Sequence, residues 1–207
     1  PKGALTKMKN KRTCEYIAEA IQNEILSGRM EAGQPLRQEE LSELLGYSRI
    51  PIREALQILE AQGLVRRLAT RHVVVADFSE KVLEEIYEMI CEVEKKALYD
   101  LVETGAKWKY DCKEEHAEEQ FHRYIYETIT NEFFRRLLET SCECFIRFSI
   151  HETFAGQEVG NVKEREECLQ RIYQAYCADK KKEMDEGLEV YYRQLIDNVK
   201  KERGFER

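Results

Sequence analysis

Proline and glycine are scarce in this sequence, and long apolar runs are missing. The chain has 3 Pro and 10 Gly among 207 residues. This composition excludes a collagen-like protein or a Pro/Gly-rich linker, and so few breakers favour long helices over a many-turned β-sandwich. No stretch approaches the roughly 20 apolar residues that a membrane-spanning helix needs. Residues 1–12 carry no apolar signal core, so we expect no export signal there.

The cysteines lack the pattern of a secreted or zinc-finger protein. Their number is odd, and no Cys-x-x-Cys motif occurs. Neither a disulfide framework nor a zinc finger is therefore expected. We expect most of them to be small buried hydrophobic residues in a reduced, cytoplasmic protein. The seven are Cys14, Cys91, Cys112, Cys142, Cys144, Cys168 and Cys177.

Charge is uneven along the chain, although the net charge is −7. Residues 1–76 hold 12 Lys and Arg against 9 Asp and Glu, whereas residues 77–207 hold 21 against 31. This asymmetry predicts two domains with different partners. Residues 1–11 are interpreted as a flexible basic arm, which either is simply solvated or adds non-specific attraction to DNA phosphates.

The spacing of apolar residues predicts two helices in the first 46 residues. Ile17, Ile21 and Ile25 recur every four residues and form one face of the first helix. A second, short helix is predicted over residues 38–45 and ends at Gly46. Its inward-facing residues are expected to be Leu41, Leu44 and Leu45.

A third helix and a hairpin complete the N-terminal pattern. Ser48 is a good N-cap for this helix, and Pro51 is tolerated in its first turn. The helix stops at Gly63, and two β-prone runs, residues 65–68 and 73–76, predict a hairpin. Three helices followed by a hairpin are the outline of a winged helix-turn-helix over residues 12–77. The buried stripe of the third helix is Ile52, Leu56 and Leu59.

Residues 78–207 are predicted to form an all-α antiparallel bundle, so the fold class of the chain is mainly α. An Asp77-x-x-Glu80 variant of the capping box predicts the start of a long helix. Further helices are expected over residues 109–129, 132–154, 161–178 and 181–202, with no strand. The interior of such a bundle has room for a ligand. The long helix carries one apolar side, made of Val82, Ile86, Ile90, Val93, Ala97 and Leu101.

The N-terminal end of the third helix carries side chains that suit DNA recognition. Arg49 and Arg53 are four residues apart and share a face away from the buried stripe. A recognition helix inserts its N-terminal residues into the major groove, where arginine pairs with guanine or clamps phosphate. The tip of the hairpin is placed to enter the minor groove. The predicted DNA-binding residues are Arg37, Ser48, Arg49, Arg53, Arg71 and His72.

Four segments of this region resemble the GntR family of bacterial transcription regulators. They are residues 25–28 (ILSG), 32–37 (AGQPLR), 41–56 (LSELLGYSRIPIREAL) and 59–65 (LEAQGLV). The resemblance covers residues 13–77 without a gap. It implies that Arg37, Arg49 and Arg53 contact DNA, with Ser48 beside them. At the wing tip, where the family usually has glycine, this sequence is expected to carry His72.

The C-terminal half resembles the FadR-type subgroup of that family through Glu118-x-x-Phe121-His122 and residues 130–133. The resemblance implies an all-α effector domain that binds small carboxylates, commonly through a metal held by one Asp and three His. His122 matches the first histidine, and Glu118 stands in place of the Asp. The second histidine is replaced by Leu169, or by Cys168 if the register slips by one. The third is replaced by Tyr191, or by Val190, and an arginine common in the first effector helix is replaced by Ile90.

The incomplete ligand set argues against a metal in the usual arrangement, because stable sites need three or four protein ligands. Zinc remains an option, with Glu118, His122 and Cys168 as weak candidates. Arg147 and His151, four residues apart, either bind a carboxylate in the same cavity or lie on a solvated face. The predicted effector-binding residues are Glu118, His122, Arg147, His151 and Tyr191.

These observations predict a homodimeric transcription regulator that binds a palindromic DNA operator. A small molecule such as an organic acid would bind in the helical domain and control it. The alternative is a protein that has lost metal and effector sensing and acts as a constitutive DNA-binding or interaction module. The sequence has no Ser/His/Asp order, phosphate-binding loop or nucleotide-binding glycine pattern, so we expect no enzyme.

Overall fold

The computed structural model describes residues 12–150, 153–154, 157–158 and 162–205. The chain divides into two compact units, Pro1–Asp77 and Phe78–Arg207. The mainly helical fold class is confirmed. Within the described ranges, no helix is long and apolar enough to cross a membrane.

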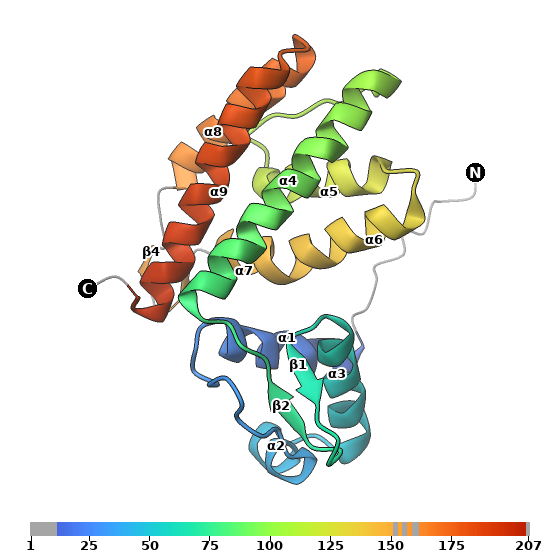
Figure 1. Cartoon of the computed structure of the whole chain (residues 1–207), viewed down its shortest axis with the longest axis vertical. Helices are drawn as coiled ribbons and strands as arrows, with labels where there is room; N and C mark the ends of the chain where they lie inside the picture. Colours follow the sequence, from blue (N-terminus) through green and yellow to red (C-terminus); the bar gives the residue numbers. More distant parts are fainter. Residues whose placement is uncertain (1–11, 151–152, 155–156, 159–161, 206–207) are drawn as a thin grey trace, which may run out of the picture. The chain divides into compact units, whose positions relative to one another are not determined.

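The first unit is a winged helix-turn-helix. It contains the helices α1 (Thr13–Leu26), α2 (Gln38–Leu45) and α3 (Arg49–Ala61) and the strands β1 (Val65–Arg67) and β2 (Val73–Val75), blue to teal in Figure 1. The two strands are antiparallel, with Val65 opposite Val75. The chain segment before α2 extends this sheet, because the amide of Leu36 donates to the carbonyl of Val73 at 2.9 Å.

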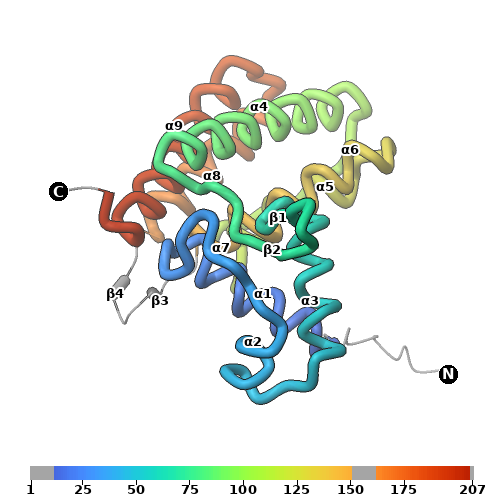
Figure 2. The backbone as a smooth tube through the Cα atoms, turned by 60° about the horizontal axis from the view of Figure 1, so that its bottom comes forward, coloured from blue at the N-terminus to red at the C-terminus, as the bar shows by residue number. Residues whose placement is uncertain are grey.

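The core of the first unit lies between α1 and α3, which cross in both views (Figures 1 and 2). The apolar faces predicted for these two helices are buried. Gly46 ends α2 with a φ of 71°, a left-handed conformation that favours glycine. In α2, only Leu41 is fully buried, and Leu44 is 75% exposed. The expectation that Leu44 faces inward was therefore wrong, because a helix of eight residues has one narrow buried side.

The second unit is a helical bundle. Its helices are α4 (Glu80–Thr104), α5 (Ala117–Thr128), α6 (Glu132–Ser141), α7 (Arg147–Ile150), α8 (Val162–Cys177) and α9 (Lys181–Arg203), with a π-helical turn, η1, over Cys142–Ile146. Helices α8 and α9 form an antiparallel hairpin, and α9 also packs along α4. Helix α5 contacts α4, α6 and α8, so its inner face looks into the centre of the bundle.

Close contact between α8 and α9 depends on a glycine. A Cβ added to Gly187 of α9 would lie 2.6 Å from Cγ1 of Ile172 on α8. Ile172 is fully buried, so it has little space to move aside. Gly187 therefore lets the two helices approach more closely than any other residue would allow.

Two sequence predictions for this unit were wrong at element ends. Helix α4 begins at Glu80 with Ser79 as its N-cap, so Asp77 lies outside the helix and forms no capping box there. The predicted helix over residues 109–129 begins only at Ala117. The segment between α4 and α5 is held instead by two tyrosines of α8. The hydroxyl of Tyr176 donates to the Ala106 carbonyl at 2.6 Å, and that of Tyr173 donates to the Trp108 carbonyl at 3.0 Å.

The predicted helix over residues 132–154 is also interrupted. It consists of α6, η1 and α7 and ends at Ile150. Two short strands follow, β3 (Thr153–Phe154) and β4 (Gln157–Glu158), which pair antiparallel. The expectation of no strand after Phe78 was therefore wrong. A pairing of two residues per strand is too short to leave a periodic pattern in the sequence.

Candidate functional site

The exposed end of α3 carries the arginines that the sequence singled out. Ser48 is the N-cap of α3, as predicted, but its side chain makes no capping hydrogen bond. Arg49 and Arg53 lie on the exposed side of the helix, opposite the buried Ile52 and Leu56. This arrangement leaves the hydroxyl of Ser48 and both guanidinium groups facing solvent.

Acidic residues of α2 hold two of the arginines in place. Arg49 Nη1 lies 3.2 Å from Glu39 Oε1, and Arg37 Nη1 lies 2.8 Å from Glu40 Oε1. All four side chains are more than half exposed. Exposed ion pairs of this kind contribute only about 0–1 kcal/mol, so a phosphate or a base can replace the glutamates at little cost.

The turn between β1 and β2 lies beside the N-terminal end of α2. Arg37, Glu39, Arg67, Arg71 and His72 line one groove of this unit. The turn is tight, because the Leu68 amide donates to His72 and the Arg71 amide donates to Leu68, both at 2.8 Å. Three basic side chains and His72 therefore gather along one edge of the unit.

The residue that needs a left-handed backbone at this turn is Arg71, with a φ of 67°. The sequence analysis expected His72 to stand at the position where the family usually has glycine. The structure points to Arg71 instead, because that is the conformation in which glycine is preferred. Arg67 was missed by the sequence analysis. It pairs with Glu60 at 2.9 Å, and its Nη1 also donates to the Arg71 carbonyl at 3.4 Å.

The second unit contains a buried polar cluster, which we call the Arg165 cluster. It draws on α4, α5, α8 and α9. Every member is at most 8% exposed. Its members are Glu94, Glu118, His122, Arg165, Tyr191 and Tyr192.

Helix α5 supplies two residues of the cluster from one face. Glu118 accepts hydrogen bonds from Arg165, Nε to Oε1 at 2.8 Å and Nη2 to Oε2 at 3.1 Å. Its Oε1 also accepts a bond from the Tyr191 hydroxyl at 2.8 Å. His122, one turn later, lies with its Nε2 2.8 Å from the same hydroxyl. Tyr191 thus joins the carboxylate to the imidazole.

Glu94 of α4 closes the other side of the cluster. Its Oε1 lies 2.6 Å from His122 Nδ1, and its Oε2 accepts a bond from the Tyr192 hydroxyl at 2.7 Å. Burial, together with these carboxylates, raises the pKa of Tyr191 and of Tyr192 well above the ordinary value. Both phenols therefore stay protonated and act as hydrogen-bond donors.

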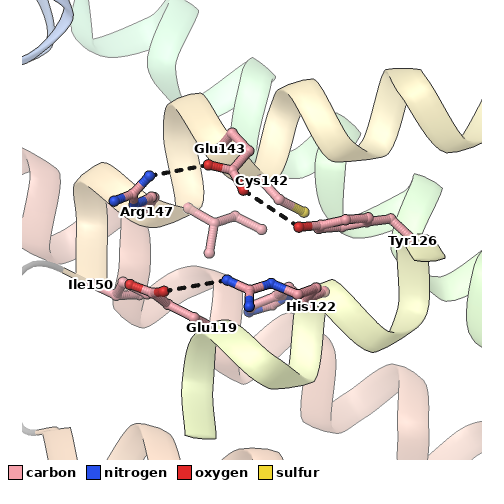
Figure 3. Close-up of a pocket in the computed structure, with 9 residues that line it drawn as sticks. Glu119, His122, Tyr126, Cys142, Glu143, Arg147 and Ile150 are labelled. Atoms are coloured by element: carbon pink, nitrogen blue, oxygen red, sulfur yellow. Dashed lines mark hydrogen bonds and ion pairs between the residues drawn. The ribbon is translucent and has the colours of Figure 1, made fainter. Parts of the chain in front are cut away.

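A small pocket adjoins His122 on the side of η1 (Figure 3). Its wall contains two ion pairs, Arg147 Nη1 to Glu143 Oε2 at 3.2 Å and Arg123 Nη2 to Glu119 Oε2 at 3.8 Å. The π-helical turn places Glu143 in this wall, and single π turns inside helices are frequent at functional sites. The other lining residues are His122, Tyr126, Cys142, Ile146 and Ile150.

The structure brings together some of the predicted effector residues and separates others. Glu118, His122 and Tyr191 meet in the Arg165 cluster, whereas Arg147 lines the adjoining pocket with His122. His151 lies outside the described residues. Glu94 and Arg165 were not among the residues predicted from the sequence.

Of the weak metal candidates, Glu118 and His122 meet in the Arg165 cluster, but Cys168 forms no ligand group with them among the described residues. The Cys168 thiol donates to the carbonyl of Gly187 at 3.3 Å, and Glu118 is engaged with Arg165. The described residues contain one other group with suitable ligand atoms, namely Glu94, His122 and Cys142, whose atoms lie within 4.8 Å of one another.

Comparisons with known proteins fit this architecture. The pattern of the family described as "Bacterial regulatory proteins, gntR family" matches residues 13–75. The "Glc operon transcriptional activator" of Escherichia coli K12 is 33% identical over 102 residues, which are 48% of this chain and 40% of that protein. The "Gluconate operon transcriptional repressor" of Bacillus licheniformis is 37% identical over 73 residues, or 35% and 30%. The chain thus spans less than half of either relative.

Solved structures show the same fold over nearly the whole chain. The structure titled "Lar controls the expression of the Listeria monocytogenes agr system and mediates virulence" has a TM-score of 0.57 at 19% identity and covers 93% of this chain and 99% of its own. Escherichia coli McbR/YncC has a TM-score of 0.54 at 20% identity, with 92% and 98% covered. Residues 13–75 match the family pattern and fold as a winged helix-turn-helix, so this unit is a winged helix-turn-helix domain of the gntR family of bacterial regulatory proteins.

Proposed function

We propose that this protein is a cytoplasmic, DNA-binding transcriptional regulator that acts as a homodimer on a palindromic operator. The observation that carries the proposal is the exposed basic edge of the first unit. Ser48, Arg49 and Arg53 occupy the N-terminal end of α3, the part of a recognition helix that contacts bases. Arg37 and the turn at Arg71 and His72 are placed to contact the flanking backbone and minor groove.

The ion pairs of the free protein support this role. Glu39 and Glu40 lie against the exposed guanidinium groups of Arg49 and Arg37, so both arginines already have an anionic partner that DNA can replace. A guanine edge or a phosphate then replaces the glutamate. Because these pairs are exposed and weak, the exchange favours DNA, whose phosphates carry a much denser negative charge.

Selection of random-sequence duplexes by the purified protein tests the proposal. We expect enrichment of a palindrome, because a two-fold protein requires a two-fold site. The double variant R49A/R53A should enrich none. The control K163A/K182A removes the same charge from exposed positions of the second unit and should enrich the same palindrome. Enrichment of that palindrome by R49A/R53A would refute base readout through α3.

We further propose that the carboxylate of a small organic acid binds at the pocket beside His122, which has room for about one water molecule until a glutamate side chain leaves its wall. Arg123 and Arg147 supply the positive charge there, and a ligand carboxylate would take the place of Glu119 or Glu143 as their partner. Thermal unfolding in the presence of a panel of organic acids tests this, because a ligand that binds only the folded state raises the Tm. The R147A variant should lose the shift, whereas the exposed-site variant R193A should keep it.

The alternative is a constitutive DNA-binding protein that senses nothing. One observation favours it: the polar groups at the centre of the bundle already satisfy one another through the Arg165 cluster. Thermal unfolding with the same panel of organic acids distinguishes the two functions. A sensor shows a ligand-dependent Tm shift and a changed affinity for its operator, and a constitutive binder shows neither.

A further inference from the structure

The residues around His122 determine whether a metal ion can bind at the centre of the helical unit. The resemblance to FadR-type regulators implies a divalent cation bound at His122. A metal site needs three or four ligand atoms that are free to turn towards the ion. In the Arg165 cluster, the atoms that would have to bind the ion already form hydrogen bonds with one another.

The two cluster residues of α5, Glu118 and His122, already have hydrogen-bond partners on each of their polar atoms. His122 has Glu94 Oε1 on its Nδ1 side at 2.6 Å and the Tyr191 hydroxyl on its Nε2 side at 2.8 Å. Both oxygens of Glu118 accept bonds from Arg165. A metal at this place would have to break a bidentate arginine–carboxylate pair, which is among the stronger interactions of this kind.

The charges of the cluster also balance without an added ion. Glu118 and the Arg165 guanidinium, 1% exposed, form one neutral pair. The Tyr191 hydroxyl donates its hydrogen bond to Glu118. Its oxygen therefore accepts the hydrogen bond from His122 Nε2. His122 Nδ1 and Glu94 Oε1 lie 2.6 Å apart, and two bare acceptor atoms would repel each other at that distance, so one shared proton lies between them and leaves the pair neutral. A divalent cation would therefore add charge to a site that is already neutral and buried.

The group Glu94, His122 and Cys142 offers no better site. Both oxygens of Glu94 are already in hydrogen bonds, and a cysteine binds zinc as the thiolate. Both ring nitrogens of His122 are engaged as well. The three ligand atoms are therefore close, but two of the three residues would have to give up their present hydrogen bonds to bind an ion.

We infer that the guanidinium of Arg165 replaces the metal ion at the centre of the helical unit, so that this unit folds and binds its ligand without any divalent cation. The positive charge that anchors Glu118 comes from α8 of the chain itself. A ligand in the adjoining pocket is then held by side chains such as Arg123 and Arg147 and not by a metal. The inference concerns the second unit alone, and it stands whether or not the first unit binds DNA.

The unmodified chain, freed of any affinity tag, gives the first test. We expect less than about 0.1 equivalent of any transition metal per chain, and no change in Tm on adding either a chelator or excess Zn²⁺. One tightly bound metal per chain, or a Tm lowered by the chelator, would overturn the inference. With Co²⁺, a thiolate-to-metal charge-transfer band that is present in the parent and lost in C142A would show that Cys142 binds the ion instead, which also overturns the inference.

Variants of Arg165 give the second test. R165M leaves the buried Glu118 without its cation and should lower the Tm by about 10 °C. E118Q/R165M replaces the charged pair by neutral groups of similar size and should recover most of that loss.

A gain of metal binding completes the test. R165M/Y191H frees Glu118 and places a second histidine beside His122, so Zn²⁺ should raise its Tm. R171M/Y191H changes an exposed arginine of the same helix, keeps Arg165, and should not respond. An equal response of both variants to Zn²⁺ would contradict the role given to Arg165.

Discussion

Tyr191 is the residue that joins the two halves of the Arg165 cluster. Its single hydroxyl lies 2.8 Å from both Glu118 Oε1 and His122 Nε2. Y191F removes this hydroxyl and leaves a buried nitrogen and a buried oxygen each short of one partner. We expect the free energy of unfolding to fall by about 1–3 kcal/mol, as measured by urea denaturation. Y47F removes a hydroxyl from a residue that is 44% exposed and should cost far less.

We expect the cysteines to differ in reactivity, because some are buried and others are exposed. Burial raises the pKa of Cys144 to about 12, whereas Cys177 is exposed at the end of α8. Because the thiolate is the reactive form, iodoacetamide at pH 8.5 should label Cys177 within minutes and Cys142 and Cys144 only after unfolding. Mass spectrometry of the digested protein measures this. Equal labelling of Cys144 and Cys177 in the folded protein would contradict the structure.

Single residues also show how much of the site the sequence could indicate. Glu118 and His122 were identified because the segment that contains them resembles the effector domain of FadR-type regulators. Glu94 and Arg165 were missed, because a charged residue within a helix pattern is normally solvated. A signal was present for Glu94, which lies four residues after the buried Ile90 and three before the buried Ala97. Which partner would neutralise it depends on contacts between distant helices, and no local pattern encodes these.

Among the elements, the α8–α9 hairpin depends on the absence of a side chain at Gly187. G187A would place a methyl group 2.6 Å from Ile172 Cγ1. We expect a loss of about 1–3 kcal/mol in stability from overpacking, despite the better helix propensity of alanine. E186A changes the neighbouring residue, whose side chain is 64% exposed, and should be close to neutral in the same urea denaturation experiment. Equal stability of G187A and the parent would contradict the packing described.

Elements with a strong apolar period were predicted well, and those fixed by tertiary contacts were not. Helices α3 and α9 match their expected ranges closely, because buried apolar residues recur along each of them. The segment before α5 was misjudged because Trp108 packs on Tyr124 with the rings nearly parallel, at a centroid distance of 4.9 Å. Aromatic packing of this kind fixes an irregular segment against its local helical preference. The π turn at Cys142–Ile146 likewise has no signature in the sequence.

For the whole molecule, the buried thiols predict a loss of stability in alkali. Burial raises the pKa of Cys91 and of Cys144 from 9 to about 12. Above pH 9 these thiols ionise in the unfolded chain but not in the folded one, which stabilises the unfolded state. Their contribution is therefore complete below pH 9 and falls as the pH rises towards 12, by about 1 kcal/mol for each thiol at pH 10. Urea denaturation at pH 7.5, 9 and 10 measures the slope, and C91A/C144A should flatten it.

For the whole molecule, we expect that the first unit reads DNA bases through α3. Fluorescence anisotropy with the selected duplex and with a scrambled one, at the same salt concentration, tests it most directly. We predict that R49A/R53A loses about 10- to 100-fold in affinity for the selected duplex for each arginine removed, and much less for the scrambled duplex. The ratio of the two affinities should therefore collapse, while K163A/K182A keeps it. An unchanged ratio of the two affinities in R49A/R53A would mean that α3 does not read the operator.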